Sequence, residues 1–155
     1  MPHIHEKIDF TAEVFVVHNN KVLLRKHDKY KVWLSVGGHI ELDEYPNQAA
    51  AREVKEEVGL TVKLFGQAHV DNDENDYKEL VPPMYLNRHR ISPSHEHVTM
   101  VYFATSNTEE LVLSSNEKSD ECRWFTRQEL AGLKLRKNVA FYANKALDAL
   151  AYVQL

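Results

Sequence analysis

Three glutamates stand close together in the stretch AREVKEEVGL, from Ala51 to Leu60. Glu53, Glu56 and Glu57 have helical spacing, which stacks them on one face, where like charges repel one another. A divalent cation relieves such repulsion, and Mg²⁺ and Mn²⁺ prefer carboxylate oxygens completed by phosphate oxygens and waters. A metal site for phosphate chemistry is therefore one interpretation. Taken alone, the run is more simply a solvated helix face with Arg52 and Glu56 as an i,i+4 pair.

The residues upstream of these glutamates favour the metal site over the solvated helix face. Five residues separate Gly38 from Glu44, and seven more separate Glu44 from Arg52. From Gly38 to Leu60 the chain fills every specified position of the signature of the Nudix hydrolases, and seven of those positions are fixed identities. Ordinary residue frequencies would produce such a match in roughly one chain in a million. The sequence thus resembles the Nudix family, with one departure at Val36, where many members carry a proline.

The resemblance implies an α/β fold, an α/β/α sandwich with a mixed central sheet in which the signature forms a loop-helix-loop metal site. It also implies a hydrolase that depends on Mg²⁺, with Mn²⁺ as a substitute. Such an enzyme cleaves the phosphoanhydride bond of a nucleoside diphosphate linked to another moiety. Nucleoside triphosphates, ADP-ribose and other nucleotide sugars, and dinucleoside polyphosphates all fit that description, and nothing in the sequence selects among them.

The resemblance also assigns roles within the signature. The expected metal ligands are the glutamates of the helix and a main-chain carbonyl of the loop before it: Glu53, Glu56, Glu57 and Gly38. Glu56 is either a further ligand or a general base, and Glu57 is expected to be essential for catalysis. Arg52 orients the carboxylates, and Glu44 supports it from outside the coordination sphere of the metal.

Residues outside the signature are candidates for substrate contact. Arg25 is the best candidate for binding a substrate phosphate among the cations that precede the loop, the others being Lys26, Lys29 and Lys31. Some of these cations more simply keep a hairpin end solvated. Trp33 is a candidate for stacking on a nucleobase. Glu96 is a candidate general base, because a glutamate outside the signature often has that role in this family, and it is equally well read as an exposed loop carboxylate.

The histidines on both sides of Glu96 suggest zinc. His95 and His97 point to the same side of a strand, and imidazole is a common zinc ligand. The sequence identifies no third ligand, so a zinc site is only a remote alternative here.

Two rival functions are compatible with a resemblance at the level of the fold. Non-catalytic nucleotide sensors of the Nudix fold commonly lose signature carboxylates, whereas this chain keeps all of them. An isoprenoid diphosphate isomerase uses a cysteine upstream of the signature, but the only cysteine here is Cys122. Hydrolysis is therefore the expected activity, and the sensor is the alternative.

Composition sets the broad class. The 155 residues are expected to form one domain, residues 1–155, acting on a small-molecule nucleotide. The net charge of −4 argues against a general nucleic-acid-binding surface. No apolar run approaches the roughly 20 residues needed to cross a membrane. A single cysteine provides no disulfide framework, which fits a cytoplasmic protein.

Hydrophobic patterning predicts the elements that position these residues. Residues 10–18 and 21–26 are expected to form a hairpin around Asn19-Asn20. Pro46 suits the first turn of the signature helix, Gly59 ends it, and its apolar stripe is expected at Ala51, Val54 and Val58. Further strands are expected at residues 32–36, 60–70, 85–91, 98–105 and 122–125, a solvated acidic loop at 71–79, and a last helix at 138–152.

Overall fold

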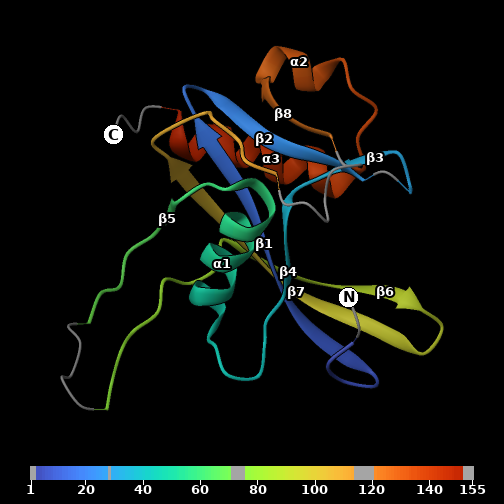
Figure 1. Cartoon of the computed structure of the whole chain (residues 1–155), viewed down its shortest axis with the longest axis vertical. Coiled ribbons are helices and arrows are strands. Elements are labelled where there is room, and N and C mark those ends of the chain that lie inside the picture. The colour runs from blue at the N-terminus through green and yellow to red at the C-terminus, as the bar shows by residue number, and fades with distance from the viewer. Residues whose placement is uncertain (1–2, 28, 71–75, 114–120, 152–155) are drawn as a thin grey trace.

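The computed structural model describes residues 3–27, 29–70, 76–113 and 121–151, which form a layered α/β fold (Figure 1). Its strands are β1 (Ile8–His18), β2 (Lys21–His27), β3 (Val32–Leu34), β4 (Val36–His39), β5 (Val62–Leu64), β6 (Tyr85–Ser92), β7 (His95–Ser106) and β8 (Glu121–Thr126). Its helices are α1 (Pro46–Val58), α2 (Arg127–Ala131) and α3 (Lys137–Leu150). Part of the predicted acidic loop, residues 71–75, lies outside the described residues.

The long strand β1 organises the mixed sheet. It runs parallel to β7 from Ile8, opposite Glu96, to Val17, opposite Thr105. Its other edge pairs with β2 only at the hairpin end and with β4 along its middle. Beyond these pairs, β2 carries β3 and β8, while β7 carries β5 and β6. The sheet therefore has two halves that share β1 and β7.

Helices cover the two faces of this sheet, which confirms the predicted α/β/α sandwich. Figure 1 shows α1 in front of the sheet and α3 behind it. Buried apolar side chains fill both interfaces. Val54 of α1 belongs to a cluster with Ala12, Val14, Leu23, Val36 and Tyr102 of the sheet, and Leu147 of α3 belongs to one with Phe15, Leu24, Phe103 and Phe125. Full burial of such a side chain contributes about 1.5–3 kcal/mol. Packing on both faces thus fixes α1 against the strand that carries the signature glycines.

Helix α1 begins and ends where the sequence indicates. Pro46 occupies the first turn, where its missing N–H leaves no hydrogen bond unmade. Gly59 ends the helix in the left-handed region with φ of 75°, and its N–H donates to Lys55 O at 3.0 Å. A Cβ at Gly59 would lie 2.8 Å from Val112 Cβ, so glycine is required on steric grounds as well.

The buried face of α1 differs from the predicted stripe at one position. Val54 is buried as expected, but Ala51 is exposed and Ala50 takes its place. Adjacent residues are about 100° apart on a helix, and both alanines stand at helical spacing from Val54, so the pattern did not separate them. This rotation brings Glu53 and Glu57 into the buried face, where they are 4% and 8% exposed.

Three strands differ in extent from the sequence prediction. The segment 32–36 is two strands, because the chain leaves the edge of β2 at Ser35 and continues along β1 as β4. Strand β5 keeps only Val62–Leu64 of the predicted 60–70. Strand β7 already begins at His95, because its pairing with β1 continues to Ile8. The hairpin, β6, β8 and the last helix agree with the prediction to within a few residues.

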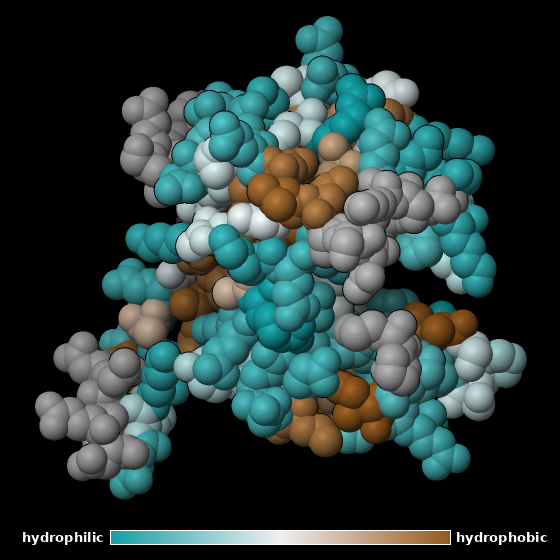
Figure 2. Space-filling view, in the orientation of Figure 1, coloured by the Kyte–Doolittle hydropathy of each residue, from teal (hydrophilic) through white to brown (hydrophobic). Residues whose placement is uncertain are grey.

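The face that carries α1 is mostly hydrophilic, and its hydrophobic residues form separate patches (Figure 2). Scattered apolar residues of this kind are ordinary on a protein surface. None of the helices in the described part of the chain has both the length and the apolar character needed to cross a bilayer.

The hairpin turn gives a test of the fold. Asn19 and Asn20 have φ of 47° and 60°, as a two-residue turn with both central residues left-handed requires. Asn20→Gly should stabilise the protein by about 0.5 kcal/mol, and Asn20→Val should destabilise it by about 1–2 kcal/mol, because a branched side chain is strained at positive φ. Asn107 is exposed and is not at positive φ. Asn107→Gly is therefore a matched control that should not stabilise, and urea unfolding measures all three variants. A stabilising Asn107→Gly or a neutral Asn20→Val would contradict the turn geometry.

Candidate functional site

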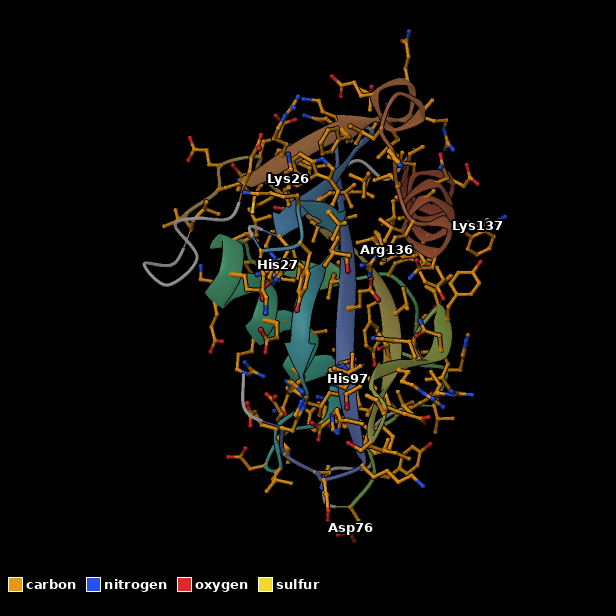
Figure 3. All side chains as sticks on the ribbon, turned by 90° about the vertical axis from the view of Figure 1, so that its right-hand side faces the viewer. Lys26, His27, Asp76, His97, Arg136 and Lys137 are labelled. Carbon is orange, nitrogen blue, oxygen red and sulfur yellow. The ribbon has the colours of Figure 1, made fainter. Side chains whose placement is uncertain are left out.

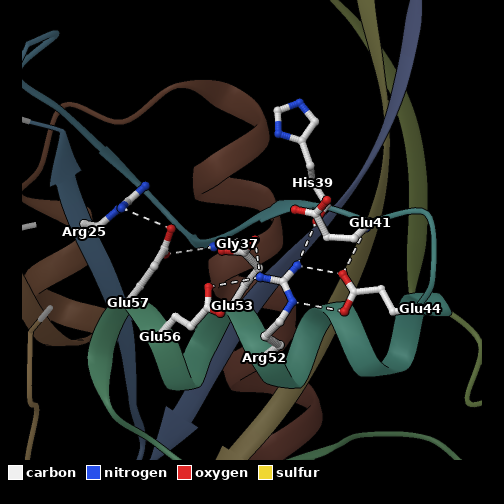
Figure 4. A network of polar contacts seen from close by, with 9 residues as sticks. All are labelled: Arg25, Gly37, His39, Glu41, Glu44, Arg52, Glu53, Glu56 and Glu57. Atoms are coloured by element: carbon white, nitrogen blue, oxygen red, sulfur yellow. Dashed lines mark hydrogen bonds and ion pairs between the residues drawn. The ribbon is translucent and has the colours of Figure 1, made fainter. Parts of the chain in front are cut away.

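Arg52 is the centre of a polar network between α1 and the loop before it (Figure 4). Its guanidinium donates to Glu44 from Nε at 3.0 Å and from Nη2 at 2.6 Å. Its Nη1 donates to Glu53 Oε1 and to Glu56 Oε2, both at 3.0 Å. Nη2 also donates to the main-chain oxygen of His39 at 3.1 Å. Because the guanidinium is planar and rigid, one side chain orients three carboxylates relative to the loop.

Glu57 is anchored separately, one turn beyond Glu53. Its Oε2 accepts a hydrogen bond from the Gly37 N–H at 3.2 Å, and its Oε1 lies 3.2 Å from Arg25 Nη1. The side chains of Arg25 and Glu57 are only 14% and 10% exposed. Arg25 faces α1 because it stands two residues from Leu23, which packs in the core beneath α1. The structure thus brings Arg25 to a predicted metal ligand.

Gly38 brings the loop directly against Glu53. A Cβ on Gly38 would lie 2.5 Å from both Cδ and Oε1 of Glu53. Only glycine permits that approach, because any side chain would displace the carboxylate. The main chain near Gly38 and the Glu53 carboxylate therefore adjoin, as a shared set of oxygen ligands requires.

Burial and charge pairing shift the pKa values of these carboxylates in opposite directions. The hydrogen bond from Arg52 lowers the pKa of Glu44, and the same bond raises the pKa of Arg52. Burial raises the pKa of Glu53, with Arg52 acting against that effect. The four carboxylates of Glu44, Glu53, Glu56 and Glu57 pair with the guanidiniums of Arg25 and Arg52. Their oxygen atoms are the kind of donor that a divalent cation such as Mg²⁺ prefers.

Two predicted site residues lie outside this network. Glu96, on β7, has its Oε1 3.4 Å from Arg88 Nη1 and 3.9 Å from Arg90 Nη2. Trp33, on β3, packs edge-on against Phe125 with ring centroids 4.9 Å apart. Phe125 belongs to the core that faces α3, so Trp33 lies with the residues on the opposite side of the sheet from α1. The roles assigned to Glu96 and Trp33 remain predictions.

Sequence reasoning missed a second group of side chains. His95 and His97, which lacked a third partner in the sequence, lie beside Asp9 and His3, with all four ligand atoms within 4.8 Å of one another. Burial, reinforced by neighbouring imidazoles, lowers the pKa of His97 to about 4. The alternation His95-Glu96-His97 was the available signal. The partners of these histidines are in the N-terminal segment and β1, and the parallel pairing of β1 with β7 brings them close. No local sequence pattern predicts a contact between segments so far apart in the chain.

Comparisons with known proteins agree with this geometry. A family model of the NUDIX domain matches residues 9–149. Dihydroneopterin triphosphate diphosphatase from Haemophilus influenzae is 29% identical over 135 residues, which cover 86% of this chain and 83% of that protein. The m7GpppN-mRNA hydrolase NUDT17 from Xenopus laevis is 29% identical over 115 residues, covering 68% of this chain but only 37% of that protein.

Solved structures show the same relationship. A NUDIX-family hydrolase from Clostridium perfringens superposes with a TM-score of 0.84 at 36% identity, covering 92% of this chain and 97% of that one. A MutT NUDIX hydrolase from Burkholderia pseudomallei, at 21% identity and a TM-score of 0.62, shares the fold over 94% of this chain. With the family model matching nearly the whole chain, this protein belongs to the Nudix hydrolases, enzymes that act on phosphorus-containing anhydrides.

Proposed function

We propose that this chain uses Mg²⁺, with Mn²⁺ as a substitute, to hydrolyse the phosphoanhydride bond of a nucleoside diphosphate linked to another moiety. The observation that carries the proposal is the pair of buried carboxylates, Glu53 and Glu57, packed against the glycine loop on the helix that also carries Glu56. Like charges gathered on one helix repel one another, and a divalent cation would relieve that repulsion.

The donor set suits a hard cation. The residues that would hold it offer only oxygen atoms: the carboxylates of Glu53, Glu56 and Glu57 and a main-chain carbonyl near Gly38. When bound, Mg²⁺ would neutralise phosphate oxygens and lower the pKa of the attacking water. Soft or nitrogen-preferring ions have no matching donor in this set.

The side chains of the network have separable tasks. Arg52, held in one plane by its bidentate pair with Glu44, positions the carboxylates of Glu53 and Glu56. The side chain of Glu56 is 60% exposed, so solvent water can reach it. We favour Glu56 as the residue that accepts the proton of the attacking water. Glu96 is the less favoured base, because its carboxylate already pairs with two arginines on β6.

The substrate is proposed to be a small nucleotide or nucleotide-like diphosphate. The relative from Haemophilus influenzae is named for a triphosphate of a pterin, so a triphosphate cleaved to release pyrophosphate is the first class to test. Cys122 is the single cysteine of the sequence, which provides no disulfide framework and agrees with the cytoplasmic compartment that we propose.

A substrate panel tests the activity. The chain should turn over at least one member of a set of nucleoside triphosphates, dihydroneopterin triphosphate, ADP-ribose, nucleotide sugars and dinucleoside polyphosphates with Mg²⁺. Product analysis should find cleavage within the diphosphate unit, because the metal that the proposed ligands would hold binds phosphate oxygens. If no member is hydrolysed with either Mg²⁺ or Mn²⁺ at neutral and alkaline pH, the non-catalytic sensor replaces this proposal.

Glu57→Gln tests the metal ligands. The change should lower kcat by about 100-fold or more, because it removes a charged ligand. Without metal the variant should lose about 1–2 kcal/mol of stability, since the ion pair between Glu57 and Arg25 is replaced by a contact with a neutral amide. Mg²⁺ at 100 times its Kd should stabilise the wild type by about 2.7 kcal/mol and the variant much less.

Glu110→Gln is the matched control for this test, because Glu110 is an exposed glutamate outside the signature. Turnover and thermal unfolding, each with Mg²⁺ and with chelator, compare the three proteins. Equal kcat and equal Mg²⁺ stabilisation in the wild type and Glu57→Gln would exclude Glu57 as a ligand.

Kinetic measurements distinguish two possible roles of the Arg25 guanidinium. If its guanidinium binds substrate phosphate, Arg25→Ala should lower kcat/KM at least tenfold even at saturating Mg²⁺, and Arg25→Lys should restore part of it. If it only balances Glu57, the bound metal would take over that task, and kcat/KM at saturating Mg²⁺ should match the wild type. Lys29 is an exposed cation in the turn that follows β2, so Lys29→Ala is the control and should be neutral.

A further inference from the structure

A cluster of imidazoles surrounds one carboxylate on the face of the sheet opposite α1. Asp9 is fully buried on β1, and the parallel register places it directly opposite His97 on β7. His95 stands two residues before His97 and so shares its face, and His3 of the N-terminal segment lies over them, with its ring centroid 3.6 Å from that of His95. Figure 3 shows His97 in the half of the sheet away from Lys26 and His27.

Several nitrogen atoms converge on a single oxygen of Asp9. His3 Nδ1 lies 3.1 Å from Asp9 Oδ2, and the Nε2 atoms of His39 and His95 each lie 3.3 Å from it. The other oxygen, Oδ1, accepts the main-chain N–H of His5 at 2.6 Å. Asp9 is therefore held in place by the backbone and points one lone-pair-bearing oxygen at a group of imidazoles.

The tautomer of His95 leaves a lone pair aimed at that oxygen. His95 Nδ1 lies 2.9 Å from the main-chain oxygen of Glu6, which can only accept, so Nδ1 is the donor of this hydrogen bond. In the neutral tautomer with that proton on Nδ1, Nε2 carries a lone pair, and it lies 3.3 Å from Asp9 Oδ2. Among the described residues, the buried Nε2 atoms of His39, His95 and His97 make no hydrogen bond. Buried polar atoms are rarely left unsatisfied, and a bound cation would satisfy those of His95 and His97 together.

We propose that His3, Asp9, His95 and His97 form a Zn²⁺ site separate from the signature glutamates. Ligand atoms around a tetrahedral Zn²⁺, with bonds of about 2.0–2.1 Å, lie about 3.3 Å apart. The 3.1 Å and 3.3 Å contacts of His3 and His95 with Asp9 already have that spacing, and all four ligand atoms lie within 4.8 Å. Three imidazoles and one carboxylate suit zinc, whereas Mg²⁺ prefers oxygen donors alone.

The site has the outer contacts and the access that a metal centre needs. The Glu6 carbonyl orients His95, and the main-chain N–H groups of Ile4 and His5 orient Asp9. The side chain of His3 is 44% exposed, which gives the ion a path from solvent. Four protein ligands complete a tetrahedron and leave no position for a reacting water, so the site has a structural role.

A zinc ion bound here would stabilise the signature loop from the face of the sheet opposite α1. It would fasten the N-terminal segment to β1 and β7 beside His39, the last residue of β4. The imidazole of His39 points away from Arg52, while its main-chain oxygen accepts from the Arg52 guanidinium (Figure 4). One residue of β4 thus borders both sites, although the two sets of ligands are distinct.

Zinc binding by the full-length protein tests the assignment. Protein stripped with chelator is titrated with Zn²⁺ in excess Mg²⁺, and bound zinc is counted by atomic emission after gel filtration. The wild type should retain one zinc per chain. His97→Ala should lower the affinity by about 100-fold or more, while His69→Ala, a change at an exposed histidine elsewhere, should not. Zinc should also raise the Tm of the wild type but not that of His97→Ala.

Two further variants keep the test decisive. His3 precedes β1 and lies outside every strand, so His3→Ala should fold normally and still lower zinc affinity at least tenfold. Glu57→Gln should bind zinc as the wild type does, which separates this site from the signature carboxylates whether or not the chain hydrolyses nucleotides. Zinc binding that is unchanged in both His3→Ala and His97→Ala, lost in Glu57→Gln, or absent from the wild type overturns the proposal.

Discussion

The structure depends on the burial of two carboxylates, Glu53 and Glu57, against a loop of glycines. Removing such charges from water is costly unless they are paired and hydrogen-bonded. Arg52, Arg25 and the Gly37 N–H supply those partners, and the absence of a side chain at Gly38 makes the room. The same carboxylates offer oxygen donors on one helix face, which is the set that the proposed divalent cation would use.

The glycine loop depends on the way the sheet divides into two halves. Because β1 pairs with β2 only at their hairpin end, its edge is left open for β4, and the chain enters α1 from there. Strand β4 alternates like any strand, so Gly38 meets Glu53 on one face while the His39 side chain reaches Asp9 on the other. The two sites therefore lie back to back across one short strand.

These two sites differ in the chemistry of their donors. The signature offers oxygen atoms on a helix and loop, a set suited to a hard cation that shares its sphere with phosphates. The cluster around Asp9 offers mainly imidazole nitrogens from the N-terminal segment and β7, a set suited to zinc. Discrimination between metals would then follow from ligand type, without any need for the sites to be shielded from each other.

The sequence alone determined the family, the helix and the local turns. The signature spacing, Pro46 and Gly59 define α1, and Asn19-Asn20 defines the hairpin, because each depends on residues a few positions apart. Tertiary structure decided which alanine of α1 is buried, that Arg25 meets Glu57, and that Asp9 joins the histidines of β7. The parallel pairing of β1 with β7 joins residues as distant as Thr11 and Thr99, 88 positions apart. Such contacts arise from the packing of whole elements, and no local periodicity encodes them.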